Sequence, residues 1–159
     1  FYAAIMVAGE KKIREKIEDS GKVYERFGLT PMQGRIVAYF THSDSPEKTF
    51  EEIVDFFGAS KSSVSNSLNH LLDSGIADYR TYASDRKRYF YLTDRFFTVF
   101  FRKVLGNVNE LKAHAYRAVS LRSPEHPEAS ETILKWIGDA NLIGGRIEKA
   151  LSEIQEEKG

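Results

Sequence analysis

The chain contains no cysteine, which excludes disulfide bonds and thiolate metal ligands. It has no apolar run near the roughly 18 residues that a membrane-spanning helix needs, and no signal peptide is visible. Net charge is absent as well, because 23 basic residues balance 23 acidic ones. Any binding to nucleic acid must therefore come from a local basic patch. We expect a soluble cytoplasmic protein with no membrane partner.

The sequence also lacks the motifs of common enzymes. Its four histidines, His42, His70, His114 and His126, are scattered and show no metal-binding spacing. Neither a G-x-S-x-G motif nor a phosphate-binding glycine loop is present. We therefore predict no enzyme activity, no catalytic residue, no metal and no cofactor.

Two capping boxes mark the starts of helices in the first third of the chain. Thr30 and Gln33 enclose Pro31, which suits the first helical position, and this helix is predicted to run to about residue 40. Thr49 and Glu52 open a short helix that ends near residue 57.

The next segment changes from helix to hairpin. Only Ala59 and Ser60 separate the short helix from another that starts at Lys61, which is the pattern of a helix-turn-helix. Residues 76–82 and 88–92 are rich in β-branched and aromatic side chains, and a polar turn at 83–87 lies between them, so they predict a β-hairpin. The expected fold is mainly α (α+β), a winged helix-turn-helix with a hairpin wing.

Long helices with apolar seams flank this segment, at about residues 6–27, 94–121 and 128–156. Their seams cannot be buried against a domain of about 60 residues, so we expect them to pack on each other and on a second copy of the chain. The predicted domains are an N-terminal dimerisation helix (1–28), a DNA-binding winged helix (29–93) and a C-terminal dimerisation region (94–159). The seams of the last two helices are Phe97, Phe101, Val104, Val108, Leu111, Ala115 and Ala118, and Ile133, Ile137, Ala140, Gly144, Ile147, Leu151 and Ile154.

The helix that starts at Lys61 has one apolar face and one face of short, uncharged polar side chains. Serine and asparagine can donate and accept hydrogen bonds, so such a face suits base edges and phosphate oxygens. Residues 61–92 hold five basic residues against three acidic ones, and three of the five are consecutive at 86–88. The predicted DNA contacts are Lys61, Ser62, Ser63, Ser65, Asn66, Asn69, His70, Arg80, Arg86, Lys87 and Arg88.

The segments FGLTPMQGRIVAYF, TFEEIVDFFGASKSSVSNSLNHLLDSGIADY and SDRKRYFYLT resemble the MarR superfamily of winged-helix transcriptional regulators, and most of all its GbsR-like branch. The resemblance covers about residues 25–93. It implies a homodimer that binds double-stranded DNA at a near-palindromic operator. It also implies control of a nearby operon, which we expect to be repression, often under a small-molecule effector.

Two alternatives to a DNA-binding regulator stay open: a winged helix that binds a partner protein, and a dimer that binds a ligand but no longer DNA. For an effector, the GbsR-like branch implies a quaternary ammonium compound, which aromatic rings can bind. The candidate ligand-binding residues are Tyr24, Phe100, Tyr116 and Trp136.

Overall fold

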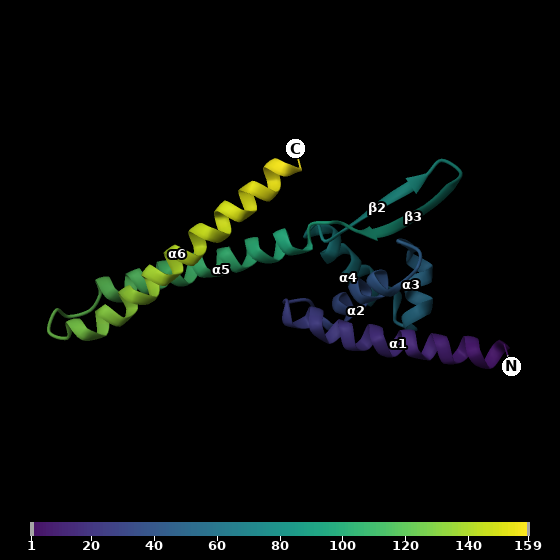
Figure 1. Cartoon of the computed structure of the whole chain (residues 1–159), viewed down its shortest axis with the longest axis horizontal. Helices are drawn as coiled ribbons and strands as arrows, with labels where there is room; N and C mark the ends of the chain where they lie inside the picture. Colours follow the sequence, from purple (N-terminus) through teal and green to yellow (C-terminus); the bar gives the residue numbers. More distant parts are fainter. Residues whose placement is uncertain (1, 159) are drawn as a thin grey trace. The chain divides into compact units, whose positions relative to one another are not determined.

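A computed structural model describes residues 2–158, with side chains described from residue 9 onward (Figure 1). Phe1 and Gly159, which the predicted terminal domains include, lie outside the described residues. The chain forms two compact units, Phe1–Phe96 and Phe97–Gly159. The elements are α1 (Tyr2–Arg26), α2 (Pro31–His42), β1 (Glu47–Thr49), α3 (Phe50–Phe57), α4 (Lys61–Asp73), β2 (Ala77–Tyr82), β3 (Asp85–Leu92), α5 (Phe96–Ser120) and α6 (Pro127–Glu157).

Both predicted capping boxes are confirmed. The Thr30 hydroxyl accepts from the Gln33 backbone N–H, and the Gln33 side chain accepts from the Thr30 N–H at 3.0 Å. At α3 the Thr49 N–H donates to the Glu52 carboxylate at 2.7 Å, and this bond is the main reason that the pKa of Glu52 lies below its usual range. Each box satisfies helix-end N–H groups that would otherwise lack a partner, so these two helices begin where local chemistry predicts.

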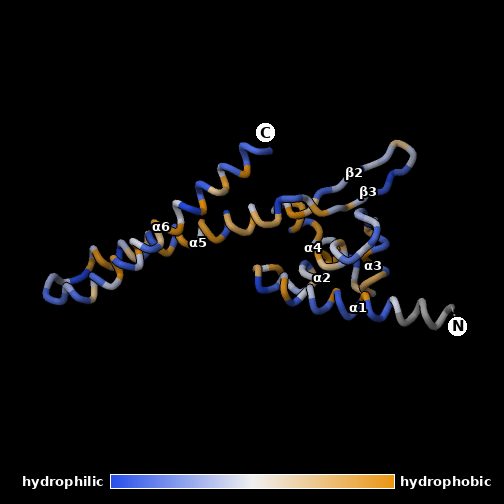
Figure 2. The backbone as a smooth tube through the Cα atoms, viewed as in Figure 1, coloured by the Kyte–Doolittle hydropathy of each residue, from blue (hydrophilic) through white to orange (hydrophobic). Residues whose placement is uncertain are grey.

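The core of the first unit lies between α2, α3 and α4. Its fully buried side chains come from all three helices, and Figure 2 shows hydrophobic residues concentrated where α2 and α4 lie. No buried side-chain nitrogen or oxygen atom among the described residues lacks a hydrogen-bond partner. The core is mainly apolar, and its largest buried side chains in these helices are Ile36, Val37, Ile53, Val64, Leu68 and Leu71.

A three-stranded antiparallel sheet in the order β1-β3-β2 completes the winged helix. The hairpin of β2 and β3 confirms the predicted wing, but the predicted loop at 83–87 is too long. Tyr82 pairs with Asp85, so only Ala83 and Ser84 connect the strands. Sequence patterns do not predict strand β1, because three residues beside a capping box are too few to show the alternation of a strand.

Helices α1 and α2 approach closely at two glycines. A Cβ atom built on Gly34 of α2 would lie 2.7 Å from the backbone oxygen of Gly21 in α1. Beside this crossing, Arg35 forms an ion pair with Glu18 at 2.9 Å. Because α1 is about twice as long as α2, only part of it can pack there. This explains why Ile13 of α1 is 44% exposed.

The second unit pairs α5 with α6. On α6, the predicted seam members Ile137, Gly144 and Leu151 are buried. The Gly144 backbone lies against Leu105 of α5, where an added Cβ would be 3.4 Å from the Leu105 side chain. On α5, no residue is fully buried, and the predicted seam residue Phe97 is 63% exposed. Two helices alone can cover only one face of each other, so broad apolar stripes remain exposed within this pair.

We predict that Gly34→Ala lowers the free energy of unfolding by about 1–3 kcal/mol, because the new methyl group overlaps the α1 backbone. Urea denaturation measures the change. Gly9→Ala in α1 is the matched control, since nothing lies within 4 Å of its added Cβ. The control should leave stability unchanged or raise it by up to about 1 kcal/mol. Equal effects of the two substitutions would contradict a close helix crossing.

Candidate nucleic-acid interface

Helix α4 turns its polar face to solvent because its apolar face is locked into the core. Val64, Leu68 and Leu71 are 0%, 2% and 0% exposed, which fixes the rotation of the helix about its axis. Ser60 caps the helix, and its side-chain oxygen accepts from the Ser63 backbone N–H at 3.2 Å. The predicted contact residues of α4 are all exposed or half-exposed; they are Lys61, Ser62, Ser63, Ser65, Asn66, Asn69 and His70.

The three consecutive cations lie on strand β3 and not in the hairpin loop. The register passes from the pair Thr81–Arg88 directly to the pair Tyr82–Asp85, so Arg86 and Lys87 form an irregularity in the strand. All three cations are exposed, and within residues 9–158 none of them forms an ion pair. They therefore remain available for a negatively charged partner.

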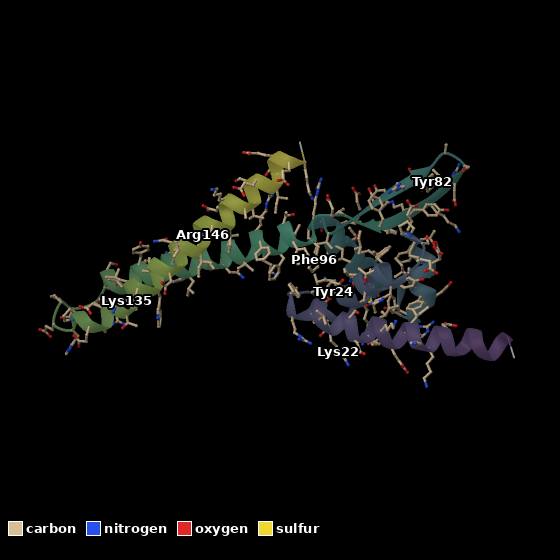
Figure 3. All side chains as sticks on the ribbon, in the orientation of Figure 1. Lys22, Tyr24, Tyr82, Phe96, Lys135 and Arg146 are labelled. Carbon is tan, nitrogen blue, oxygen red and sulfur yellow. The ribbon has the colours of Figure 1, made fainter. Side chains whose placement is uncertain are left out.

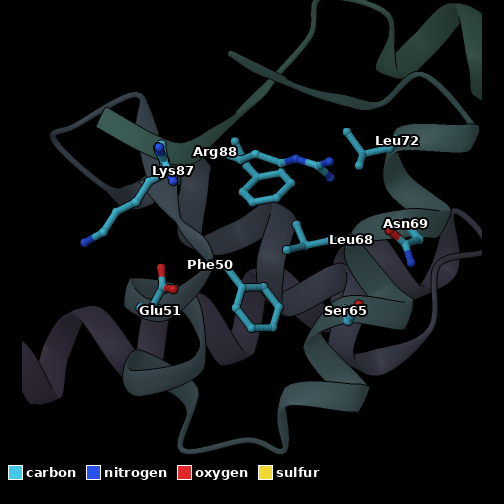
Figure 4. Close-up of a pocket in the computed structure, with 10 residues that line it drawn as sticks. Phe50, Glu51, Ser65, Leu68, Asn69, Leu72, Lys87 and Arg88 are labelled. Carbon is cyan, nitrogen blue, oxygen red and sulfur yellow. The ribbon is translucent and has the colours of Figure 1, made fainter. Parts of the chain in front are cut away.

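Helix α4 and strand β3 face each other across a groove of about 380 Å³ (Figure 4). Its floor is apolar, with Phe50 of α3 beside Leu68, and Figure 4 shows Arg88 reaching from β3 toward Leu72 of α4. The structure thus brings five predicted contact residues together from two separate elements. They are Ser65, Asn69, Arg86, Lys87 and Arg88.

Asp85 organises the start of β3. Its carboxylate accepts from the Tyr89 hydroxyl at 2.7 Å and from the Lys87 backbone N–H at 3.0 Å. The hydrogen bond from Tyr89 is the main reason that the pKa of Asp85 lies below its usual range, and the bond from the Lys87 N–H is the second reason. Asp85 is therefore ionised at neutral pH and fixes the backbone that carries Arg86 and Lys87.

Arg80 is the one predicted wing cation that the structure places apart from the groove. Its Nε atom lies 2.9 Å from the Glu47 carboxylate, and its guanidinium lies 4.4 Å over the Tyr91 ring. Because side chains alternate between the faces of a strand, Tyr89 and Tyr91 point to the face opposite Arg88. Arg88 lies over the Tyr79 ring at 4.6 Å on its own face.

Sequence reasoning misses several residues of this region. Glu51 lines the groove and puts one carboxylate beside its cations. Glu47 falls within a segment that reads as a polar loop, although it pairs with Tyr91 in the sheet. For Tyr82 and Tyr89, the sequence indicates only a preference for β-strand. Tyr82 bonds to Glu47, which is distant in sequence, and the bond from Tyr89 to Asp85 within strand β3 is not visible in β-propensity.

The four ligand candidates are not brought together within either unit. In the first unit the Tyr24 ring meets Phe96 edge to face at 5.5 Å (Figure 3). In the second unit Phe100 contacts Phe101, while Tyr116 and Trp136 are 51% and 66% exposed. None of the four lines the groove between α4 and β3, or a second groove that α5 and α6 form within their own unit.

Neither a cluster of metal ligands nor a membrane-spanning helix occurs in the described part of the chain. No group of three or more His, Asp or Glu side chains gathers as a metal site there. None of the helices that the structure describes is both long and apolar enough to cross a bilayer.

Comparison with known proteins finds a family that resembles the segment carrying most of the groove. Residues 27–88 match the family model described as the MarR family. This segment of the chain is therefore similar to the MarR family. The sequence resemblance and the expected fold are confirmed at this level, whereas the GbsR-like branch is not distinguished. The members of this family are transcription regulators and not enzymes.

The MarR-type winged helix has relatives of low identity. The chain is 26% identical over 106 residues to the HTH-type transcriptional regulator MmpR5 of Mycobacterium tuberculosis, and the match covers 67% of this chain and 64% of that protein. The crystal structure of a transcriptional regulator superposes with a TM-score of 0.67 at 22% identity, covering 91% of this chain and 99% of that chain. The Staphylococcus aureus MepR–DNA complex is 19% identical with a TM-score of 0.43, covering 88% of this chain and 98% of that chain. At 22% identity, the first of these two structures supports the fold alone.

Proposed function

We propose that the protein is a sequence-specific, DNA-binding transcription regulator that binds a near-palindromic operator as a homodimer. One observation carries the proposal. Ser65 and Asn69 of the uncharged polar face of α4 and the exposed cations of β3 line a single groove in a MarR-type winged helix. This arrangement places groups that can read base edges beside groups that can bind phosphates.

The two walls of the groove have different tasks in this proposal. The exposed Asn69 of the groove and the exposed Asn66, which belongs to the same helix but does not line the groove, suit bidentate contact with adenine. Because α4 carries no arginine, it cannot read guanine through a bidentate arginine contact, and in this proposal specificity relies on A·T contacts, DNA shape or the wing. Arg86, Lys87 and Arg88 neutralise backbone phosphates and supply most of the affinity.

Homodimerisation is supported by the apolar surface of the second unit. A groove of about 380 Å³ between α5 and α6 is lined almost entirely by apolar side chains, including Phe97, Phe101, Ile143 and Ile147. Soluble monomers rarely expose a contiguous apolar patch of this kind. We propose that a helix of a second copy covers it, which also duplicates the DNA-binding groove for two half-sites.

We also propose how the activity of the protein is regulated. We place the protein in the GbsR-like branch, as a repressor that responds to a quaternary ammonium compound. Tyr24, Phe100, Tyr116 and Trp136 remain the candidate binding residues, because aromatic rings attract such cations. Isolation of the genomic fragments that the protein binds would identify the operon, and a titration with choline-type compounds would test the effector.

We predict that Asn66→Ala combined with Asn69→Ala weakens binding to the selected operator by about 1–3 kcal/mol for each asparagine that reads a base. Binding to unrelated DNA should change much less, because base contacts contribute little there. Fluorescence anisotropy with both DNAs measures the two affinities. The matched control replaces the exposed Asn107 and Asn109 of α5 by alanine. Equal reductions in affinity for both DNAs would show that α4 does not read bases.

We predict that Arg86→Ala combined with Lys87→Ala weakens binding to both DNAs. The slope of log affinity against log salt should fall by about one for each phosphate that the variant no longer neutralises. Replacing the exposed Lys11 and Lys12 of α1 removes the same charge elsewhere and serves as the control. An unchanged salt slope would contradict the proposal that Arg86 and Lys87 contact phosphates. Absence of any DNA binding at low salt, with stable capture of a partner protein, would favour a protein-interaction domain instead.

We predict that the protein sediments as a dimer at micromolar concentration. Ile143→Glu should raise the dissociation constant of the dimer at least about tenfold, because a charge would enter an apolar interface. Ser152→Glu adds the same charge to an exposed position of α6 outside the groove and is the control. A wild-type monomer in analytical ultracentrifugation would contradict the proposal.

A further inference from the structure

One face of the wing sheet carries a connected set of polar and aromatic side chains around Glu47. One carboxylate oxygen of Glu47 lies 2.9 Å from Arg80 Nε, and the other accepts from the Tyr82 hydroxyl at 2.7 Å. The Glu47 side chain is only 16% exposed, whereas that of Arg80 is 50% exposed. Both oxygens of a largely covered carboxylate are thus occupied by side chains of the hairpin.

These contacts span all three strands of the sheet. Glu47 belongs to β1, whereas Arg80 and Tyr82 belong to β2, and strand β3 lies between them. The Arg80 guanidinium crosses β3 by stacking over the Tyr91 ring. Strand β1 ends at Thr49, the N-cap of α3. The contacts therefore join the wing to the first helix of the helix-turn-helix.

A second chain of contacts continues from Tyr82 to the cations. The Tyr82 ring, labelled on the hairpin in Figure 3, meets the Tyr89 ring edge to face at 5.0 Å. The Tyr89 hydroxyl bonds to Asp85, whose other oxygen accepts from the Lys87 backbone N–H. The two carboxylates raise the pKa values of Tyr82 and Tyr89, so both hydroxyls keep their protons and donate at neutral pH.

We propose that Glu47, Arg80 and Tyr82 form a brace that holds the wing at a set angle and so positions Arg86 and Lys87. Arg80 is then a positioning residue and not a DNA contact, which revises the role expected from sequence. The consequence for DNA affinity rests on the proposed function, but the brace itself is a property of the free protein. The brace keeps the wing ordered in the free protein, so that less conformational entropy is lost when DNA binds.

The first test is direct and needs no DNA. In the free full-length protein, Tyr82→Phe removes one hydroxyl and leaves the charge unchanged. We expect hydrogen exchange of the backbone amides of residues 82–89 to accelerate at least about threefold, because the hairpin opens locally more often. Tyr116→Phe, at an exposed tyrosine of α5, is the control. Unchanged exchange at 82–89 in Tyr82→Phe would overturn the brace.

The second test measures whether the affinity for DNA rises or falls when Glu47 is replaced. Glu47→Gln removes a negative charge near the wing, so electrostatics without a brace would tighten DNA binding. The brace predicts the opposite, a decrease of about fivefold, and a similar decrease for Tyr82→Phe at constant charge. Tighter binding by Glu47→Gln, with unchanged affinity in Tyr82→Phe, would overturn the positioning role.

The two tests separate the brace from the proposed function. If the wild-type protein binds no DNA but exchange at 82–89 accelerates in Tyr82→Phe, the brace stands and the proposed function fails. If the wild-type protein binds DNA but neither variant changes exchange or affinity, the regulator stands and the brace fails. Thermal unfolding of each variant, expected to stay close to that of the wild-type protein, excludes a general loss of structure.

Discussion

The burial of one face of α4 is the constraint on which the candidate interface depends. Val64, Leu68 and Leu71 are almost completely removed from solvent. Burying such side chains contributes about 1.5–3 kcal/mol each, far more than any single exposed serine or asparagine could offset. The helix therefore cannot rotate, and Asn66 and Asn69 are held outward. Without this anchor, the polar face of α4 would have no defined position opposite β3.

The cations of strand β3 form a local positive patch although the chain as a whole is neutral. Cations and carboxylates alternate closely around the wing, but they have different partners. Asp85 is bound by Tyr89 and by a backbone N–H, and Glu47 is bound by Arg80 and Tyr82. Among the described residues, neither acid forms an ion pair with Arg86, Lys87 or Arg88. A neutral sequence can thus present a positive surface at one place.

How far the sequence predicts the structure depends on how local each interaction is. The capping boxes at Thr30 and Thr49 join residues three positions apart, so their sequence pattern is sufficient. The apolar periodicity of α4 likewise predicts its buried face. The hairpin is predicted too, but with too long a loop, because the Asp85–Tyr89 bond that extends β3 is not visible in β-propensity. The close crossing at Gly21 and Gly34 depends on the packing of two helices and leaves no readable pattern.

The order of helices, the hairpin, the MarR resemblance and the polar composition of α4 can be read from the sequence alone. These follow from hydrogen bonds and periodicities that span a few residues. The groove that Asn69 and Arg88 share, and the ion pair of Arg80 with Glu47 on the other face of the sheet, are visible only in the folded chain. The sheet order β1-β3-β2 places residue 47 across strand β3 from residues 80 and 82, and no local sequence signal encodes this order.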